Sequence, residues 1–326
     1  MQTKTILTTL AATAVSLAVT GAGGTALAET VLVEQPRPFS VDAAQGVSVY
    51  SQYDGSIGAY RLVARRGGRA EVLDVEPLPV PFDVDIGTSR TGALVAVYSR
   101  SIDDENTDLF RYSFASGSET RLAGLSSAYA SEHDPSVWRG EIAFLRSTGD
   151  GRRRLMIGST TSGGAPRTLV TRRSPQGMVN PALSSTGVAY LTASLTQEGV
   201  GFQAVHTRTL RTGKDRTIHV ARSSRRNAAR VTGPSWSDSG RALYFARTNS
   251  ALGTGNRYHR YSPATGQLTQ ARGTRHAIST AFIGGHEGLL VTTNPIGRPD
   301  SGGCSSDGQP NPCRLIATGP LTYTRP

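Results

Sequence analysis

The segment Val231–Arg247, VTGPSWSDSGRALYFAR, carries three local signals in a fixed order. Pro234 begins an extended stretch, Ser237–Gly240 has the composition of a tight turn, and Ala242–Ala246 is an apolar, aromatic-rich run of strand length. The Asp of the turn can accept a hydrogen bond from the backbone two residues on, and the Gly tolerates a positive φ. The segment therefore predicts two short strands that fold back on each other as a hairpin.

Two further strands complete this unit. Residues 257–261 alternate in polarity with a period of two, Thr265–Gly266 supplies another turn, and residues 267–271 form a last short strand. The predicted unit is a four-stranded antiparallel meander.

The same order of signals recurs along the chain and constrains the fold most strongly. The first unit begins near Phe39, and the later units begin at Pro81, Pro135, Pro181, Pro234 and Ala281, at intervals of 54, 46, 53 and 47 residues. This spacing is close to the period of about 40 to 50 residues that is typical of propeller blades. We assign the six units to residues 37–77, 81–127, 132–174, 179–224, 231–276 and 278–326.

A small sheet of this kind cannot bury both of its faces alone. Packing the units face to face in a ring buries them while leaving few exposed edges. The sequence thus predicts an all-β fold, a six-bladed β-propeller of four-stranded antiparallel blades that forms one domain over residues 29–326. The last unit includes Leu321–Thr324 as a strand but is short of an outer strand, and we expect the isolated strand at residues 30–34 to complete it.

The unit resembles the TolB-like, WD40-type periplasmic propeller repeat, most closely at Pro234–Gly240 and Pro263–Gly266. Pro135–Gly140 and Pro181–Gly187 keep only the Pro and the turn Gly. This resemblance covers residues 36–326 as architecture and implies a protein that binds partner proteins. The best-known members carry an additional N-terminal α/β domain, for which this sequence shows no counterpart.

The first 28 residues have the features of a cleavable signal peptide. Lys4 gives a positive start, Ile6–Val19 is largely apolar, and Ala26–Ala28 is a small-x-small cleavage site. No later segment has the length or hydrophobicity of a membrane span. We expect cleavage after Ala28 and a secreted or periplasmic protein, working as a monomer.

The chain contains two cysteines, Cys304 and Cys313. An exported protein meets an oxidising compartment, so these two residues are predicted to form a disulfide. The competing interpretation, a metal site, lacks further Cys or nearby His ligands.

The formal net charge of +11 comes almost entirely from arginine. One hypothesis is therefore binding of an anionic wall polymer through Arg-rich loops. The one dense cluster, Arg222, Arg225, Arg226 and Arg230, has no aromatic residues among it, which indicates a solvated loop and not a nucleic-acid surface.

Polar residues gather where chains of this architecture enter the central channel. Asp83 and Asp85 of the second unit, His133 and Asp134 of the third and Asn180 of the fourth are candidates for a divalent metal or polar-ligand site. The alternative is that these groups only cap strand ends and hold water. A second acidic cluster, Asp103–Asp108, lacks the spacing of a calcium loop and is expected to be solvated.

The sequence contains no nucleophile motif of the G-x-S-x-G type and no His pair with zincin spacing. We therefore expect no cofactor and no catalysis, but recognition of a protein or envelope component by one face of loops. The enzyme alternative is a metal-dependent hydrolase or lactonase built from Asp83, His133, Asp134 and Asn180. Trp138 and Trp236 are expected to pack between blades.

Overall fold

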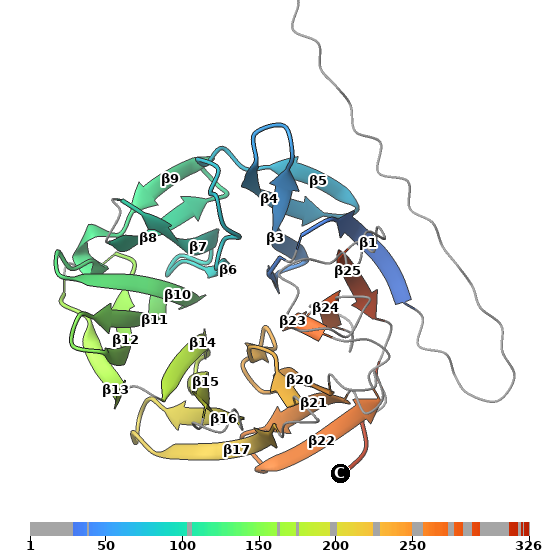
Figure 1. The fold of residues 1–326 in the computed structure, drawn as a ribbon. Helices are drawn as coiled ribbons and strands as arrows, with labels where there is room; N and C mark the ends of the chain where they lie inside the picture. Colours follow the sequence, from blue (N-terminus) through green and yellow to red (C-terminus); the bar gives the residue numbers. More distant parts are fainter. Residues whose placement is uncertain are drawn as a thin grey trace, which may run out of the picture.

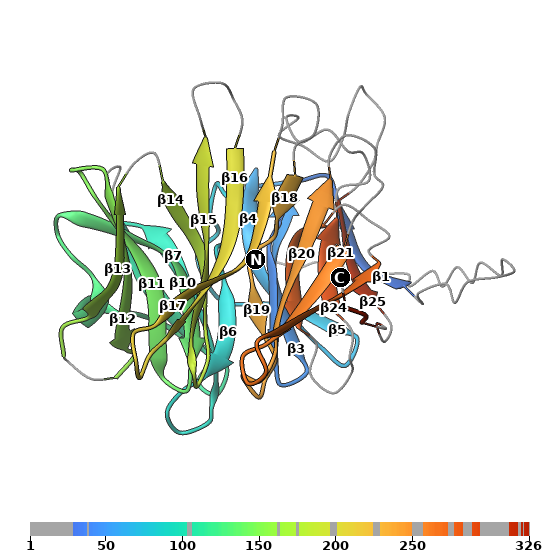
Figure 2. The ribbon, with the colours of Figure 1, turned by 90° about the horizontal axis from the view of Figure 1, so that it is seen from below.

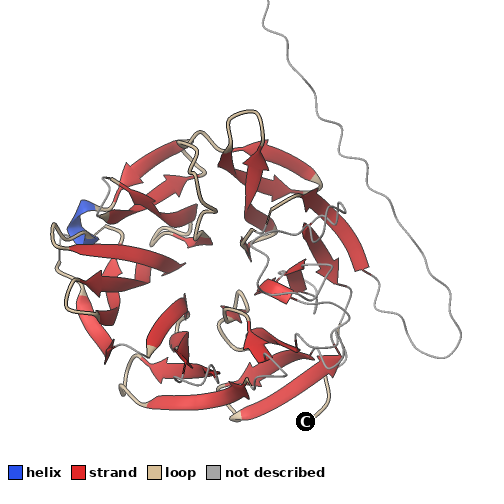
Figure 3. Ribbon diagram, viewed as in Figure 1, coloured by secondary structure: helices blue, strands red, loops and turns tan. Residues whose placement is uncertain are grey.

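The computed structural model of the protein describes residues 29–37, 39–102, 106–161, 164–173, 176–195, 201–223, 229–249, 257–272, 277–282, 289–293, 313–318, 321 and 323–325. Here the strands form sheets arranged as a ring about a central opening, a β-propeller (Figure 1). The strands run between the two faces of the ring, where the turns lie (Figure 2). The helical content of these residues is one 3-10 turn, η1 (Ala123–Leu125), and no helix among them is suited to crossing a membrane (Figure 3).

Six sheets, here called blades 1 to 6, are present in the described residues. Blades 1 to 4 are meanders of four consecutive strands. Blade 1 contains β2 (Val41–Ala44), β3 (Val47–Asp54), β4 (Ala59–Arg66) and β5 (Arg69–Val72). Blade 2 contains β6 (Asp85–Thr88), β7 (Leu94–Ser101), β8 (Thr107–Ser113) and β9 (Ser118–Arg121).

Blade 3 contains β10 (Ala130–Trp138), β11 (Glu141–Thr148), β12 (Arg152–Ser159) and β13 (Arg167–Arg173). Blade 4 contains β14 (Gly177–Leu183), β15 (Gly187–Leu195), β16 (Gly201–Thr209) and β17 (Asp215–Arg222). Blade 5 contains β18 (Ala229–Val231), β19 (Ser235–Trp236), β20 (Leu243–Asn249), β21 (Arg257–Ser262) and β22 (Gln267–Arg272). Blade 6 contains β23 (Ala277–Phe282), β24 (Leu289–Thr293), β25 (Cys313–Thr318) and β1 (Glu29–Gln35).

The turns predicted in blade 5 are present. Gly240 has a φ of 67° and its N–H donates to the Ser237 carbonyl at 2.7 Å. Gly266 also has a φ of 67°, and its N–H donates to the Ser262 carbonyl at 2.8 Å. Both positions use the left-handed conformation that glycine adopts without steric cost.

The hydrophobic core lies between neighbouring blades. Between blades 2 and 3, for example, Val97, Leu109, Ile142 and Phe144 form one cluster, and each is fully buried. Burying a side chain of this size contributes about 1.5–3 kcal/mol, so these faces hold the ring together. Trp236 packs as predicted, because its indole Nε1 donates to the Ala182 carbonyl of blade 4 at 2.9 Å.

Four strands per blade are found in five of the sheets, but blade 5 has five strands. Its innermost strand is split into β18 and β19, which both pair with β20. Pro234 lies in the gap, and proline has no N–H to donate to a sheet. Pro135 and Pro181 occupy the same place in blades 3 and 4, where the register shifts by a bulge.

The ring is closed by segments from both ends of the chain. β1 pairs with β25 in antiparallel register, which places residues 29–35 at the outer edge of blade 6. Leu321, Tyr323 and Thr324, the described residues of the predicted last strand of blade 6, are not part of that sheet. Thr324 instead forms a bridge with Gln270 on the outer strand of blade 5, through backbone bonds of 2.7 and 2.8 Å.

Four predictions fall wholly or partly outside the described residues. These are the signal peptide at residues 1–28, the cysteine partner Cys304, the acidic residues 103–105, and Arg225 and Arg226 of the arginine cluster. Cys313 is fully buried in β25. Its pairing with Cys304 stays a prediction.

Candidate functional site

The innermost strands of the blades line a cavity of about 450 Å³ in the central channel. The lining comes from the inner strands of blades 1 to 5, which surround the middle of the ring in Figure 1. Four of the five predicted site residues, Asp83, Asp85, Asp134 and Asn180, are in this lining, but His133 is not. Sequence reasoning missed two further lining carboxylates, Asp42 and Asp238.

A repeated hydrogen bond links the inner strands of blades 1 to 4 in succession. In each case a side chain on the inner strand of one blade accepts the backbone N–H of a residue in the following blade. The pairs are Ile86 N to Asp42 Oδ2 at 2.9 Å, Val137 N to Asp85 Oδ1 at 2.8 Å, and Leu183 N to Ser136 Oγ at 2.9 Å. These side chains therefore tie blades 1 to 4 together at the channel wall.

A second tier of such bonds lies two residues earlier in the chain. Asp83 accepts the N–H of Asp134 at 2.7 Å, and Asp134 accepts the N–H of Asn180 at 3.3 Å. Asp83 also accepts the N–H of Ser99 at 2.7 Å. Asp134 and Asn180 have φ values of 49° and 50°, at the bulges that precede Pro135 and Pro181. Asp and Asn tolerate this left-handed conformation better than other non-glycine residues.

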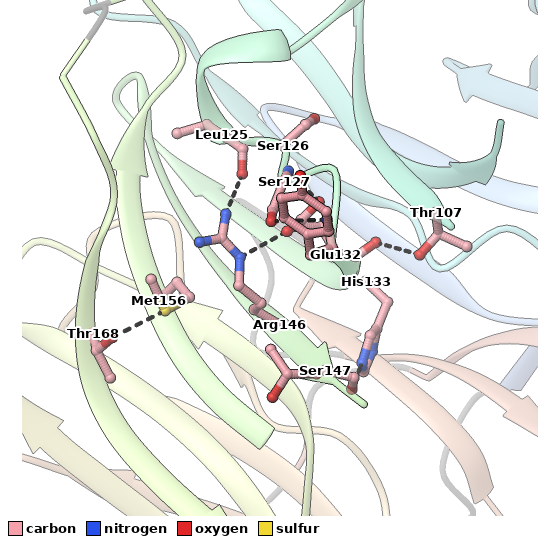
Figure 4. Close-up of polar contacts among 12 residues, drawn as sticks. Thr107, Leu125, Ser126, Ser127, Glu132, His133, Arg146, Ser147, Met156 and Thr168 are labelled. Atoms are coloured by element: carbon pink, nitrogen blue, oxygen red, sulfur yellow. Dashed lines mark hydrogen bonds and ion pairs between the residues drawn. The ribbon is translucent and has the colours of Figure 1, made fainter. Parts of the chain in front are cut away.

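His133 lies beside the channel lining. Its Nδ1 is 3.6 Å from Asp134 Oδ2, and its Nε2 is 2.8 Å from Ser147 Oγ on β11. Figure 4 shows His133 and Ser147 next to the buried pair of Glu132 and Arg146. His133 thus connects Asp134, its neighbour on β10, to Ser147 on β11.

Burial shifts the protonation of the channel carboxyls. Desolvation raises the pKa of Asp42 and of Asp83 to about 6 in each case. Desolvation and the charge of Asp42 raise the pKa of Asp85 well above its ordinary value. Burial also acts to raise the pKa of Asp134, but the hydrogen bond and charge of His133 outweigh it and lower that pKa.

The cavity is acidic although the chain is basic. Its charged lining residues are the aspartates at positions 42, 83, 85, 134 and 238 and one arginine, Arg139. No group of three or more His, Cys, Asp or Glu side chains in the described residues has a geometry that could hold a metal ion. Several of these carboxylate oxygens already accept backbone N–H groups and are not free to coordinate a bare ion. The lining is therefore suited to attracting a positively charged group that belongs to a larger ligand.

Asp42 was detectable in principle from the repeat. Asp42, Asp85 and Ser136 occupy equivalent positions on the first strands of units 1, 2 and 3. The first unit keeps only the hydrophobic rhythm of the repeat, so this alignment was not evident from the sequence. Asp238 was assigned to a turn, which is correct, but the turn also borders the channel.

Ring, blades and channel define the protein as a β-propeller with a TolB-like fold. TolB from Acinetobacter baumannii superposes with a TM-score of 0.54 at 10% identity, over 85% of this chain and 65% of TolB. The chain thus spans less than two thirds of the length of TolB.

Two further solved structures are similar to this chain. A Trypanosoma rangeli sialidase, solved with the inhibitor DANA, has a TM-score of 0.50 at 9% identity, over 89% of this chain and 55% of the sialidase. An oligogalacturonate lyase in complex with manganese has a TM-score of 0.46 at 12% identity, over 89% of this chain and 80% of the lyase. No protein-family model matches the sequence, and no curated protein matches it. At these identities the likeness concerns the fold.

Proposed function

We propose that this protein is an exported, non-catalytic propeller that binds a partner protein or envelope component through the loop face around its acidic channel. The observation that carries the proposal is the composition of the cavity, with five aspartates and one arginine. A positively charged segment of the partner would enter the channel mouth, attracted by these carboxylates. The protein would act as a single copy.

The hydrogen bonds of the channel carboxylates argue for binding over catalysis. Asp42, Asp83, Asp85 and Asp134 each accept at least one backbone N–H from the next blade. A hydrolytic metal centre needs carboxylates that are free to bind the ion. The metal-dependent hydrolase or lactonase is therefore the weaker alternative, and stoichiometric divalent metal in the purified protein would favour it.

Export is consistent with the position of the first strand. The predicted cleavage after Ala28 falls directly before β1, which begins at Glu29. Cleavage there would leave β1 intact for pairing with β25. Mass spectrometry of the mature N-terminus from the native host tests this part of the proposal.

The two tryptophans of the chain, Trp138 and Trp236, both line the channel cavity. Intrinsic fluorescence should therefore report ligand binding directly. We expect a short peptide of Lys and Arg to change the emission in a saturable way, and a Glu peptide of equal length to have no effect. The affinity should fall with added salt, because exposed charges are screened.

Charge-neutralising variants give the specific test. Asp134→Asn should weaken binding of the basic peptide, because the pKa of Asp134 is lowered and its carboxylate is charged, while Asp150→Asn, on an exposed turn outside the cavity, should leave binding unchanged. Equal affinity of wild type and Asp134→Asn would contradict the proposal. Crosslinking in the native envelope, with capture by wild type but not by Asp134→Asn, would then identify the partner.

A further inference from the structure

A second cavity, of about 210 Å³, lies between blades 2 and 3 and shares no lining residue with the channel. We call it the rim pocket. Its walls come from β8 and β9, from η1 and from the residues that follow β12. Arg111 and the threonines at positions 120, 160 and 161 are among them.

Arg111 has an unusual environment for a charged residue. It follows Leu109 by two positions on β8, so it lies on the face of the strand that packs against blade 3. Its Nε is buried and has no hydrogen-bond acceptor among the described residues. Asp108 lies on the opposite face of β8, where it pairs with Arg121.

Blade 1 shows what this position normally holds. Leu62 and Leu109 are equivalent, because the carbonyl of each accepts the N–H of a leucine after the strand, Leu73 at 2.9 Å and Leu122 at 2.8 Å. Two residues further on, Ala64 in blade 1 is buried in the core between blades 1 and 2. Blade 2 has Arg111 at this place.

Arg111 is only half-buried, but its Nε is buried and has no acceptor among the described residues, and such a donor destabilises the protein unless something accepts its hydrogen bond. The rim pocket beside it has room for a small group and is bordered by threonines. A guanidinium binds carboxylate and phosphate oxygens with matched planar geometry. The missing partner therefore has the chemistry of an oxyanion.

We propose that the rim pocket binds a small oxyanion group, a phosphate or a carboxylate, through the Arg111 guanidinium and the hydroxyl of Thr120. The group is either a free ion or one substituent of a larger molecule that extends into solvent. This site is separate from the channel, so its failure in a test leaves the proposed function unaffected.

Inorganic phosphate is the first probe. Phosphate should raise the melting temperature of the wild type more than sodium chloride does at the same ionic strength, because a ligand that binds the native state stabilises it. A rise no larger than that with chloride would overturn the proposal.

Variants locate the site. Arg111→Ala, which reproduces the residue of blade 1, should weaken phosphate binding by about tenfold or more. Thr120→Val keeps the shape of the side chain on an exposed strand and should weaken phosphate binding about threefold. This variant tests the site even if Arg111→Ala folds poorly. Arg241→Ala removes an exposed arginine that lines neither cavity and should change nothing. Undiminished phosphate binding by Arg111→Ala or by Thr120→Val would overturn the assignment.

Two further probes distinguish the sources of the oxyanion. Glucose 6-phosphate and glucuronate carry the group on a sugar, and competition by either against inorganic phosphate would identify an oxyanion on a larger molecule. Binding of inorganic phosphate alone would identify the free ion. Either result supports an oxyanion site at Arg111.

Discussion

Asp42 and Asp85 show how single residues combine structure with charge in the channel. Each accepts a backbone N–H from the next blade, and each adds to the acidic lining. Their mutual repulsion adds to the effect of desolvation in raising the pKa of Asp85. The same side chains therefore hold blades together and oppose their own ionisation.

Asp42→Asn should remove the free-energy cost of holding an ionised Asp42 carboxylate in the buried channel wall. Because the pKa of Asp42 is raised from 3.8 to about 6 on folding, its contribution to stability is full below pH 3.8 and is lost as the pH rises through 6. The melting temperature of the variant relative to wild type should therefore increase between pH 4 and pH 6.5 and then level off. Thermal melts of both proteins over this range check the prediction, and a difference independent of pH would contradict it.

The candidate site was only partly predictable at this scale. Asp83, Asp85, Asp134 and Asn180 were placed at the channel because they lie just before or within the first strand of their units. Their hydrogen bonds to the next blade could not be foreseen, because these bonds depend on how far one blade is rotated against another. The bulges at Asp134 and Asn180, which change the direction of the backbone at both residues, could not be foreseen either.

At the scale of secondary-structure elements, the connection between blades 2 and 3 is held by a buried ion pair. Arg146 on β11 donates through Nε to Glu132 at 2.7 Å and through Nη2 to the Leu125 carbonyl at 2.7 Å (Figure 4). The N–H of Ser127 donates to the second Glu132 oxygen at 3.2 Å. Burial raises the pKa of Glu132 although Arg146 opposes the shift.

Arg146→Met should destabilise the protein by about 3–5 kcal/mol, because it leaves the fully buried Glu132 carboxylate without its positively charged partner. Adding Glu132→Gln should restore part of the loss. Urea unfolding at pH 7 measures both effects. The matched control is Arg152→Met, which breaks a surface pair with Asp150 and should change the stability little. Similar losses in the two arginine variants would contradict the prediction.

The interface of blades 4 and 5 contains two histidines in contact. The rings of His219 on β17 and His259 on β21 are 4.7 Å apart, and Phe245 stacks on His259 at 4.8 Å. Both nitrogens of His259 and Nε2 of His219 are buried without a hydrogen-bond partner among the described residues. Desolvation, with the charge of Arg247, lowers the pKa of His219 to about 4 and that of His259 to about 3.

His259→Phe should therefore reduce the sensitivity of the protein to acid. A histidine with a lowered pKa contributes stability above pH 6.5 that is lost as the pH falls toward its folded pKa. The variant should be more stable than wild type at pH 5, relative to the difference between the two at pH 8. Urea unfolding at the two pH values tests this, and an equal difference at both would show that His259 has no role in acid sensitivity.

At the scale of the whole molecule, closure of the ring depends on β1. Leu32 and Val33 pack against a buried cluster that includes Phe39, Cys313 and Leu315. Glu34 also pairs with Arg314 at 2.7 Å. Without β1, one edge of β25 would be unpaired, and exposed edges promote association.

Deletion of residues 29–35 should lower the melting temperature sharply and cause oligomers to form. Scanning calorimetry and size-exclusion chromatography measure the two effects. Glu34→Gln, which removes only an exposed ion pair, serves as the control and should change the melt little. A deletion variant that melts like wild type would show that β1 is dispensable.

The architecture was more predictable than its details. Turn residues at regular spacing and short apolar strands repeat along the chain, so the blades follow from local signals that agree with one another. The split strand at Pro234 and the bridge between Thr324 and Gln270 depend on contacts between distant segments. Such contacts leave little trace in a single sequence.

The pairing of β1 with β25 also determines when folding can finish. Glu34 and Arg314 are 280 positions apart, so β1 has no partner until β25 has been synthesised. Until then its apolar side chains are open to other nascent polypeptides. The ring can therefore close only after β25 has been made and has paired with β1.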